Sequence, residues 1–124
     1  MFIMGFFMSR KRVLLLEDML EIQALIKRTV MQIPNLEVST FVSAEVAIEA
    51  YLARGHEILI LDNQVVGLMT GLDMMKELTQ LGNQPDLVIC TSSDKSLAGY
   101  VGEFFDVYTG KHPQKIRETI ENYI

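Results

Sequence analysis

Three short runs of wholly apolar residues, at positions 13–16, 58–61 and 87–90, constrain the fold of this chain more than any other feature of its sequence. Such short runs, with polar residues on both sides, are typical of strands that are buried on both faces. Residues 37–41 and 107–109 contain polar residues as well and are interpreted as a weaker and a short strand. We therefore expect five strands.

Stretches with helical periodicity alternate with these strands. Ser43 and Gly55 frame the second stretch as its N-cap and its C-terminal stop, and Pro113 stands at the first position of the last one. Gly99 and Gly102 each weaken the fourth stretch as a helix by about 1 kcal/mol. The five predicted helices cover residues 20–33, 44–54, 72–81, 94–104 and 113–124.

The alternation of buried strands and amphipathic helices predicts an α/β fold in which helices cover both faces of a parallel sheet. For a chain of 124 residues the expected arrangement is flavodoxin-like and doubly wound, with five strands in the order 2-1-3-4-5 and five helices. In sheets of this kind, ligands bind beyond the carboxyl ends of the strands. We assign residues 11–124 to this single domain.

Residues 1–10 are interpreted as a segment outside the domain. Residues 1–8 are almost wholly apolar, but they fall short of the ~20 residues of a membrane span. Basic residues follow the run, whereas they precede the apolar region of a secretory signal. One interpretation is a leader that is disordered or not native to the protein. The other is a segment that docks to a partner or forms a dimer, so a homodimer is an open alternative.

Charge and cysteine content exclude several functional classes. The net charge of -5 argues against nucleic-acid binding, which depends on clustered basic residues. The single cysteine, Cys90, has no cysteine or histidine partner at metal-binding spacing, so neither a disulfide framework nor a zinc site can form. We therefore expect a cytoplasmic protein without a membrane span.

Polar side chains follow four of the predicted strands at the edge where ligands bind. They are Glu17, Asp18, Asp62, Thr91 and Lys111. Because the first and third strands are neighbours in the predicted order, Asp18 and Asp62 are expected to share one cation. Mg²⁺ suits such a site, since it binds through one or two carboxylates and phosphate oxygens. Asp62 is the candidate nucleophile toward phosphorus, with Lys111 and Thr91 placed to neutralise the transferred oxygens.

These residues, in this order and spacing, resemble the receiver domain of bacterial two-component response regulators, and the resemblance covers residues 11–124. It implies that Asp62 is the phosphoacceptor and that Glu17 and Asp18 join it in a Mg²⁺ site. It also implies that Thr91 senses the phosphoryl group and that Lys111 is its counter-ion.

The same resemblance assigns Tyr108 to an aromatic switch residue that changes rotamer. It implies that a histidine kinase or phosphotransfer protein phosphorylates the chain, and that a downstream protein, which the sequence does not name, reads the result. Such a domain is a signalling protein and not an enzyme, apart from self-catalysed phosphoryl transfer and slow autodephosphorylation.

Two departures from the family pattern leave an alternative open. Residues 63–67 lack the usual proline, and Gly71 comes one residue late, which leaves open whether the backbone carbonyl of Gln64 completes the metal site. His112 separates Lys111 from Pro113, where the family has the proline directly after the lysine. The alternative is a degenerate receiver that acts as a phosphorylation-independent protein-binding module.

Two further classes fit the sequence less well. A phosphohydrolase with an aspartate nucleophile typically carries a second aspartate two residues later as acid and base, and Gln64 cannot take that role. A flavin-binding protein of the same fold would need a phosphate-cradling loop after the first strand, where this chain has none.

Overall fold

The computed structural model describes residues 10–124, and residues 1–9 of the predicted leader lie outside the described residues. Five strands form one parallel sheet in the order β2-β1-β3-β4-β5, which confirms the predicted topology. The strands are β1 (Lys11–Leu16), β2 (Leu36–Phe41), β3 (Ile58–Leu61), β4 (Leu87–Cys90) and β5 (Val107–Tyr108).

The five predicted helices are present. They are α1 (Leu20–Val30), α2 (Ala44–Arg54), α3 (Gly71–Gln80), η2 (Lys95–Tyr100) and α4 (Pro113–Tyr123). The Ser43 hydroxyl accepts a hydrogen bond from the backbone N–H of Val46, and Gly55 ends α2 in the left-handed conformation, as the sequence predicts. In this part of the chain, no helix has the length and apolar composition needed to cross a membrane.

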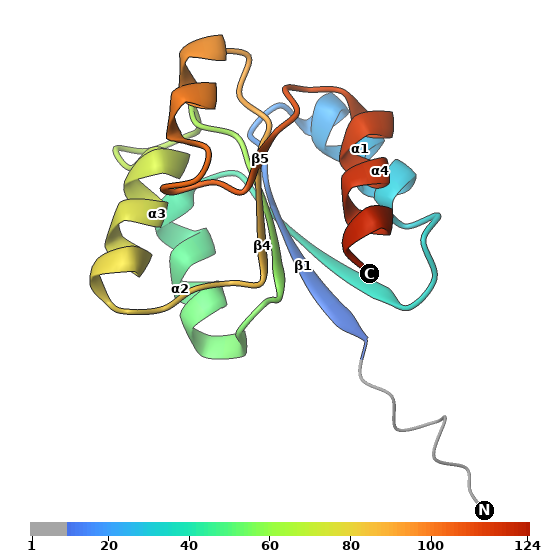
Figure 1. Ribbon diagram of the computed structural model, residues 1–124, viewed down its shortest axis with the longest axis horizontal. Helices are drawn as coiled ribbons and strands as arrows, with labels where there is room; N and C mark the ends of the chain where they lie inside the picture. The colour runs from blue at the N-terminus through green and yellow to red at the C-terminus, as the bar shows by residue number, and fades with distance from the viewer. Residues whose placement is uncertain (1–9) are drawn as a thin grey trace, which may run out of the picture.

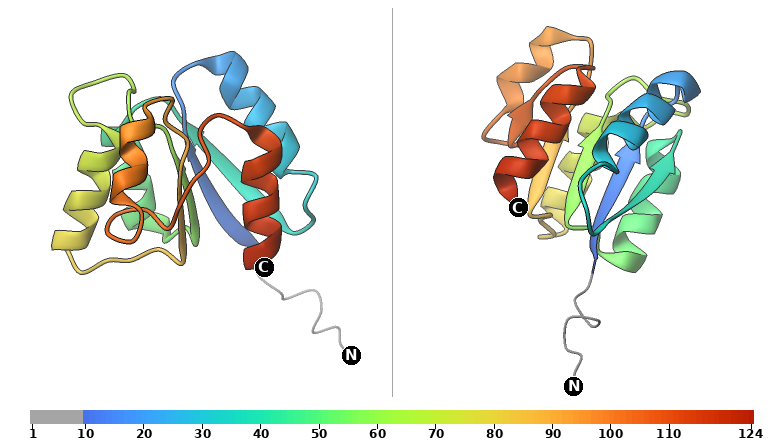
Figure 2. Two further views of the ribbon diagram at one scale, coloured as in Figure 1. Left: turned by 45° about the horizontal axis from the view of Figure 1, so that its top comes forward. Right: turned by 90° about the vertical axis from the view of Figure 1, so that its right-hand side faces the viewer.

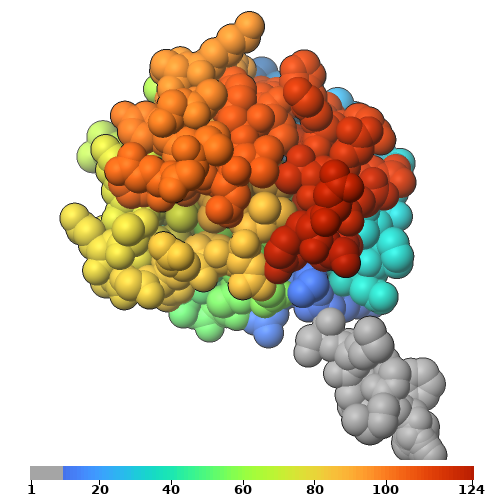
Figure 3. All heavy atoms as spheres, in the orientation of Figure 1, coloured from blue at the N-terminus to red at the C-terminus, as the bar shows by residue number. Residues whose placement is uncertain are grey.

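The fourth helix differs from its prediction, since η2 is a 3-10 helix and shorter than the expected 94–104. The chain leaves the helix at Val101, which is extended, and turns at Gly102 in the left-handed region (φ 94°). Figure 3 shows the chain after β4, coloured orange to red, spread across the upper part of the face in view.

Helices α1 and α4 cover one face of the sheet, and α2 and α3 cover the other (Figures 1 and 2). Leu14 and Leu16 of β1 pack toward α2 and α3, whereas Val13 and Leu15 pack toward α1 and α4. All four side chains are fully buried, which explains why the strand has no polar alternation.

The strand register brings the ends of four strands to one edge. Leu16 pairs with Leu61, Leu61 pairs with Cys90, and Cys90 pairs with Tyr108. The residues that follow these four positions in the sequence therefore emerge at the same carboxyl edge of the sheet.

Candidate functional site

The three predicted carboxylates meet at this edge. Glu17 and Asp18 follow β1, Asp62 follows β3, and each offers an oxygen within 4.8 Å of the others. Glu17 and Asp62 are buried, and Asp18 is partly exposed. The backbone N–H of Met19 donates to the Glu17 carboxylate (3.1 Å), which fixes one of its oxygens.

Lys111 reaches into this carboxylate cluster. Its Nζ lies 2.7 Å from Oε1 of Glu17 and 2.8 Å from Oδ2 of Asp62. Burial alone would lower the pKa of Lys111, but the hydrogen bonds and charges of Asp62 and Glu17 outweigh it and raise the pKa. When all three carboxylates are ionised, they carry two negative charges (3 − 1) beyond the one that Lys111 balances. That excess matches one divalent cation.

The backbone around Lys111 lets its side chain reach Asp62 without the proline that directly follows the lysine in the receiver pattern. No peptide bond between residues 10 and 124 is cis, so the bond from Lys111 to His112 is trans. Gly110 precedes Lys111 in the left-handed conformation (φ 65°). The insertion of His112 therefore does not keep the Lys111 side chain from Asp62.

Thr91 is fully buried at the same edge. It follows Cys90, the partner of Leu61, so it lies level with Asp62 in the register. Its hydroxyl has no hydrogen-bond partner, and a buried group left unpaired costs about 1–3 kcal/mol. The neighbouring hydroxyl of Ser92 already accepts from the backbone N–H of Asp94 (3.0 Å). Thr91 thus brings a buried hydroxyl without a partner to the carboxyl edge, and Ser92 brings a second hydroxyl that lines the hollow there.

Tyr108 lies beside this strand end and is half-buried. Its hydroxyl donates to the backbone carbonyl of Ser92 (2.7 Å). The side chain therefore links β5 to the segment that follows Thr91.

A hollow of about 420 Å³ opens over the cluster. It is lined by Asp18, Met19, Asp62, Gln64, Ser92, Ser93, Asp94 and Lys111. Gln64 is exposed at this hollow, so the loop after β3 borders the cluster. Hard oxygen donors, an excess of negative charge and an unpaired buried hydroxyl fit Mg²⁺ together with a phosphoryl group.

The sequence did not reveal the role of Asn63, which is buried directly after Asp62. Its backbone N–H donates to Oδ1 of Asp62 (2.8 Å), and its side-chain oxygen accepts from the N–H of Leu72 (2.9 Å). Its carbonyl accepts from the N–H of Gly71 (3.1 Å). Asn63 thus joins Asp62 to the start of α3. Only its place after a strand-ending aspartate could have drawn attention to it.

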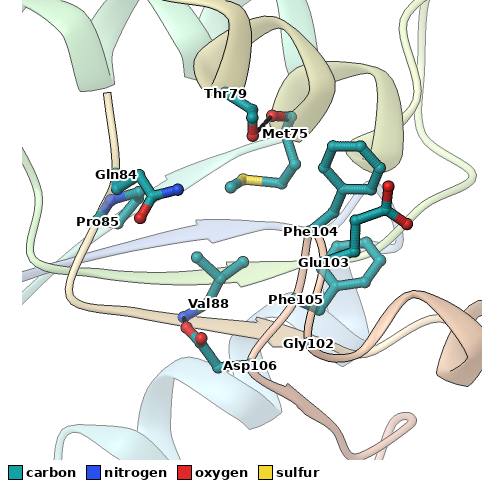
Figure 4. A pocket seen from close by; sticks show the side chains of 10 residues that line it. All are labelled: Met75, Thr79, Gln84, Pro85, Val88, Gly102, Glu103, Phe104, Phe105 and Asp106. Carbon is teal, nitrogen blue, oxygen red and sulfur yellow. Dashed lines mark hydrogen bonds between the residues drawn. The ribbon is translucent and has the colours of Figure 1, made fainter. Parts of the chain in front are cut away.

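A second hollow, of about 150 Å³, lies between α3, the amino end of β4 and residues 102–106 (Figure 4). Met75 points into it opposite Val88, and the Val88 N–H donates to the Asp106 carboxylate (2.7 Å). None of the predicted site residues lines it. The candidate site is therefore the hollow at the carboxyl edge.

No protein-family model and no curated protein sequence matches the chain. Solved structures do match it in fold. A response regulator protein from Thermotoga maritima, in complex with Mg²⁺-BeF, is 20% identical, with a TM-score of 0.79 over 92% of this chain and 99% of its own. A CheY-like response regulator receiver domain from Methylobacillus flagellatus is 20% identical, with a TM-score of 0.77 over 94% and 100%.

A chemotaxis protein, CheY4 of Vibrio cholerae, is 16% identical, with a TM-score of 0.76 over 94% of this chain and 100% of its own. At these identities the likeness concerns the fold. The chain has the CheY-like receiver fold over nearly its whole length, as the sequence predicts.

Proposed function

We propose that this protein is a two-component receiver in which Asp62 accepts a phosphoryl group from a histidine kinase or phosphotransfer protein. The observation that carries the proposal is the convergence of three carboxylates and Lys111 at Asp62, with the unpaired Thr91 hydroxyl on the neighbouring strand end, level with Asp62 in the register. A transferred phosphoryl group brings the acceptor oxygens that such a hydroxyl lacks.

The reaction is a displacement at phosphorus. A carboxylate oxygen of Asp62 forms the new P–O bond, the bond from phosphorus to the donor's leaving group breaks, and that group keeps the electron pair. The product is an aspartyl phosphate. With a phosphohistidine donor, the leaving group is an imidazole nitrogen.

The surrounding residues stabilise the charge on the transferred oxygens. The Nζ of Lys111 already donates to Asp62, and it is placed to donate to a phosphoryl group there. Glu17, Asp18, Asp62 and the backbone carbonyl of Gln64 would hold Mg²⁺. When bound, Mg²⁺ neutralises negative charge on the phosphoryl oxygens.

Phosphorylation would change the surface through Thr91 and Tyr108. As the Thr91 hydroxyl turns to the phosphoryl group, the segment after β4 moves with it. The Tyr108 hydroxyl is bonded to Ser92 in that segment, so its side chain responds to the same movement. A phosphoryl charge at Asp62 thus changes the surface of this chain that a downstream protein binds.

The alternative of a phosphorylation-independent binding module is not favoured. It rested on the loop after Asp62 and on His112. Lys111 nevertheless contacts both Glu17 and Asp62, and the three carboxylates converge. These are the charged groups that phosphoryl transfer to Asp62 would use.

Incubation with Mg²⁺ and acetyl phosphate, followed by intact mass spectrometry, tests the proposal. We expect one added phosphoryl group on the wild type and none on Asp62→Asn. Asp86→Asn is the matched control, because Asp86 is exposed and precedes β4 at the other end of the sheet. A wild type that takes up no phosphoryl group, or an adduct that persists in Asp62→Asn, would overturn the phosphoacceptor assignment.

A further inference from the structure

The loop between β3 and α3 begins and ends against Asp62. The N–H of Gly71 donates to the carbonyl of Asn63 (3.1 Å), which closes the loop at its base. A Cβ added at Gly71 would lie only 2.2 Å from the backbone oxygen of Asp62. Gln64 is the first residue beyond this base and lies at the hollow, so its position depends both on the base and on what holds the middle of the loop.

The middle of the loop is held by the carboxylate of Glu45, in the first turn of α2. Its Oε2 accepts hydrogen bonds from the backbone N–H groups of Leu68 (2.9 Å) and Met69 (3.0 Å). Gly67 adopts φ +98°, and a Cβ there would lie 2.6 Å from Oε1 of Glu45. Only glycine leaves room for this carboxylate, since it accepts the positive φ and has no side chain.

Side-chain packing fixes part of this loop, since Val65 and Met69 pack against the core. Leu68 is 97% exposed and Val66 is 55% exposed, so their side chains add little. These two residues are held through the backbone, by Glu45 and by a hydrogen bond from the N–H of Val66 to the carbonyl of Val42 (3.2 Å). Hydrogen bonds from the N–H groups of Glu45 itself, Met69 and Leu68 lower the pKa of Glu45 and keep it ionised at neutral pH.

We infer that Glu45 is a positioning residue for the Mg²⁺ site: its carboxylate fixes the loop so that Gln64 stays at the hollow beside Asp62. The inference rests on the proposed function and deepens it. The loop has no proline to stiffen it and one residue more than the family pattern, so the contact from α2 adds to the few restraints on its shape.

Three variants test the inference. Glu45→Ala removes the acceptor, whereas Glu45→Gln keeps a side-chain oxygen in place without the charge. Gly67→Ala displaces the carboxylate and changes no charge. Glu49→Ala is the matched control, because Glu49 is exposed on the same helix about one turn later.

Calorimetry measures the Mg²⁺ dissociation constant, and hydrogen exchange measures the protection of the Leu68 and Met69 amides in metal-free protein. We expect Glu45→Ala and Gly67→Ala to lose this protection and to bind Mg²⁺ about tenfold more weakly, because the carboxylate that accepts the two amide hydrogen bonds is removed or displaced. Glu45→Gln should stay within about threefold of the wild type, because neutral hydrogen bonds are roughly half as strong. Glu49→Ala should match the wild type.

The results separate this inference from the proposed function. If Glu45→Ala binds Mg²⁺ as Glu49→Ala does, or if Glu45→Gln is as weak as Glu45→Ala, Glu45 does not act by positioning the loop. If the variants behave as expected but the wild type takes up no phosphoryl group, the phosphoacceptor proposal fails and the role of Glu45 stands. A wild type that does not bind Mg²⁺ overturns the metal site and, with it, this inference.

Discussion

Lys111 supplies the positive charge that two buried carboxylates share. Replacing it in Lys111→Met leaves Glu17 and Asp62 facing each other without a counter-ion. We expect this change to lower the free energy of unfolding by about 3 kcal/mol, as when one partner of a buried ion pair is removed. Urea denaturation in the absence of divalent cations measures the loss.

The matched control is Lys115→Met, because Lys115 is an exposed residue of α4. Added Mg²⁺ should restore much of the stability of Lys111→Met, since a cation at the cluster takes over the missing charge. Equal stability of the two variants without Mg²⁺ would show that Lys111 does not offset the buried carboxylates.

The site residues that the sequence predicted share one property: each lies within three residues of the carboxyl end of a predicted strand. Strand order alone brings Asp62, Thr91 and Lys111 to the same edge. Glu45 has no such signal, because its partners lie 23 and 24 residues away in a loop without regular structure. The conformation of that loop decides the contact, and periodicity does not specify loop conformation.

At the scale of elements, strands were predicted better than helix ends. The bounds of β3 and β4 match the apolar runs, because full burial requires every residue of a short central strand to be apolar. Helix α1 ends at Val30 instead of 33: Pro34 disfavours helical conformation at Ile33, and the chain leaves the helix through tighter turns in which the N–H groups of Gln32 and Ile33 donate to Thr29 and Val30. Helix α3 starts one residue earlier than expected, because Thr70 and Asp73 form a capping box.

The first residue of α3, Gly71, packs closely against the backbone of Asp62. In Gly71→Ala the new methyl group would meet the backbone oxygen of Asp62 at 2.2 Å, so the helix or the strand end must move. We expect a loss of about 3 kcal/mol in the free energy of unfolding, at the upper end of the cost of overpacking. Urea denaturation monitored by circular dichroism measures it.

Gly99→Ala is the control for this change, because a Cβ at Gly99 meets nothing within 4 Å. Its stability should equal that of the wild type or exceed it by up to about 1 kcal/mol, since alanine restricts the unfolded chain. A Gly71→Ala protein as stable as Gly99→Ala would mean that α3 does not pack against Asp62 as closely as described.

For the molecule as a whole, buried polar groups without hydrogen-bond partners lie at both ends of the sheet. The carboxyl edge collects buried polar groups, including a hydroxyl without a partner. The amino edge carries His56, directly before Glu57 and β3, whose burial no pattern in the sequence predicts. His56 is 2% exposed, neither ring nitrogen has a hydrogen-bond partner, and its ring stacks on Tyr51.

Stability should therefore depend on pH through His56. Burial lowers its pKa, and the charges of Arg12 and Arg54 lower it further, against opposing effects of Glu57 and Glu37. The unfolded chain then binds a proton near pH 6.5, at a pH where the folded protein does not. The free energy of unfolding should be fully retained above pH 6.5 and should fall as the pH decreases below it.

Urea denaturation between pH 7.5 and pH 5 tests this expectation with variants of the two histidines of the chain. His56→Phe keeps an aromatic ring against Tyr51 and removes the titrating group, so its stability should change much less over this range. His112→Gln changes an exposed histidine and should retain the decline. The carboxylates whose pKa is lowered, Glu45, Asp73 and Asp94, lose their contribution only at lower pH. A decline that persists in His56→Phe would place its origin in another group.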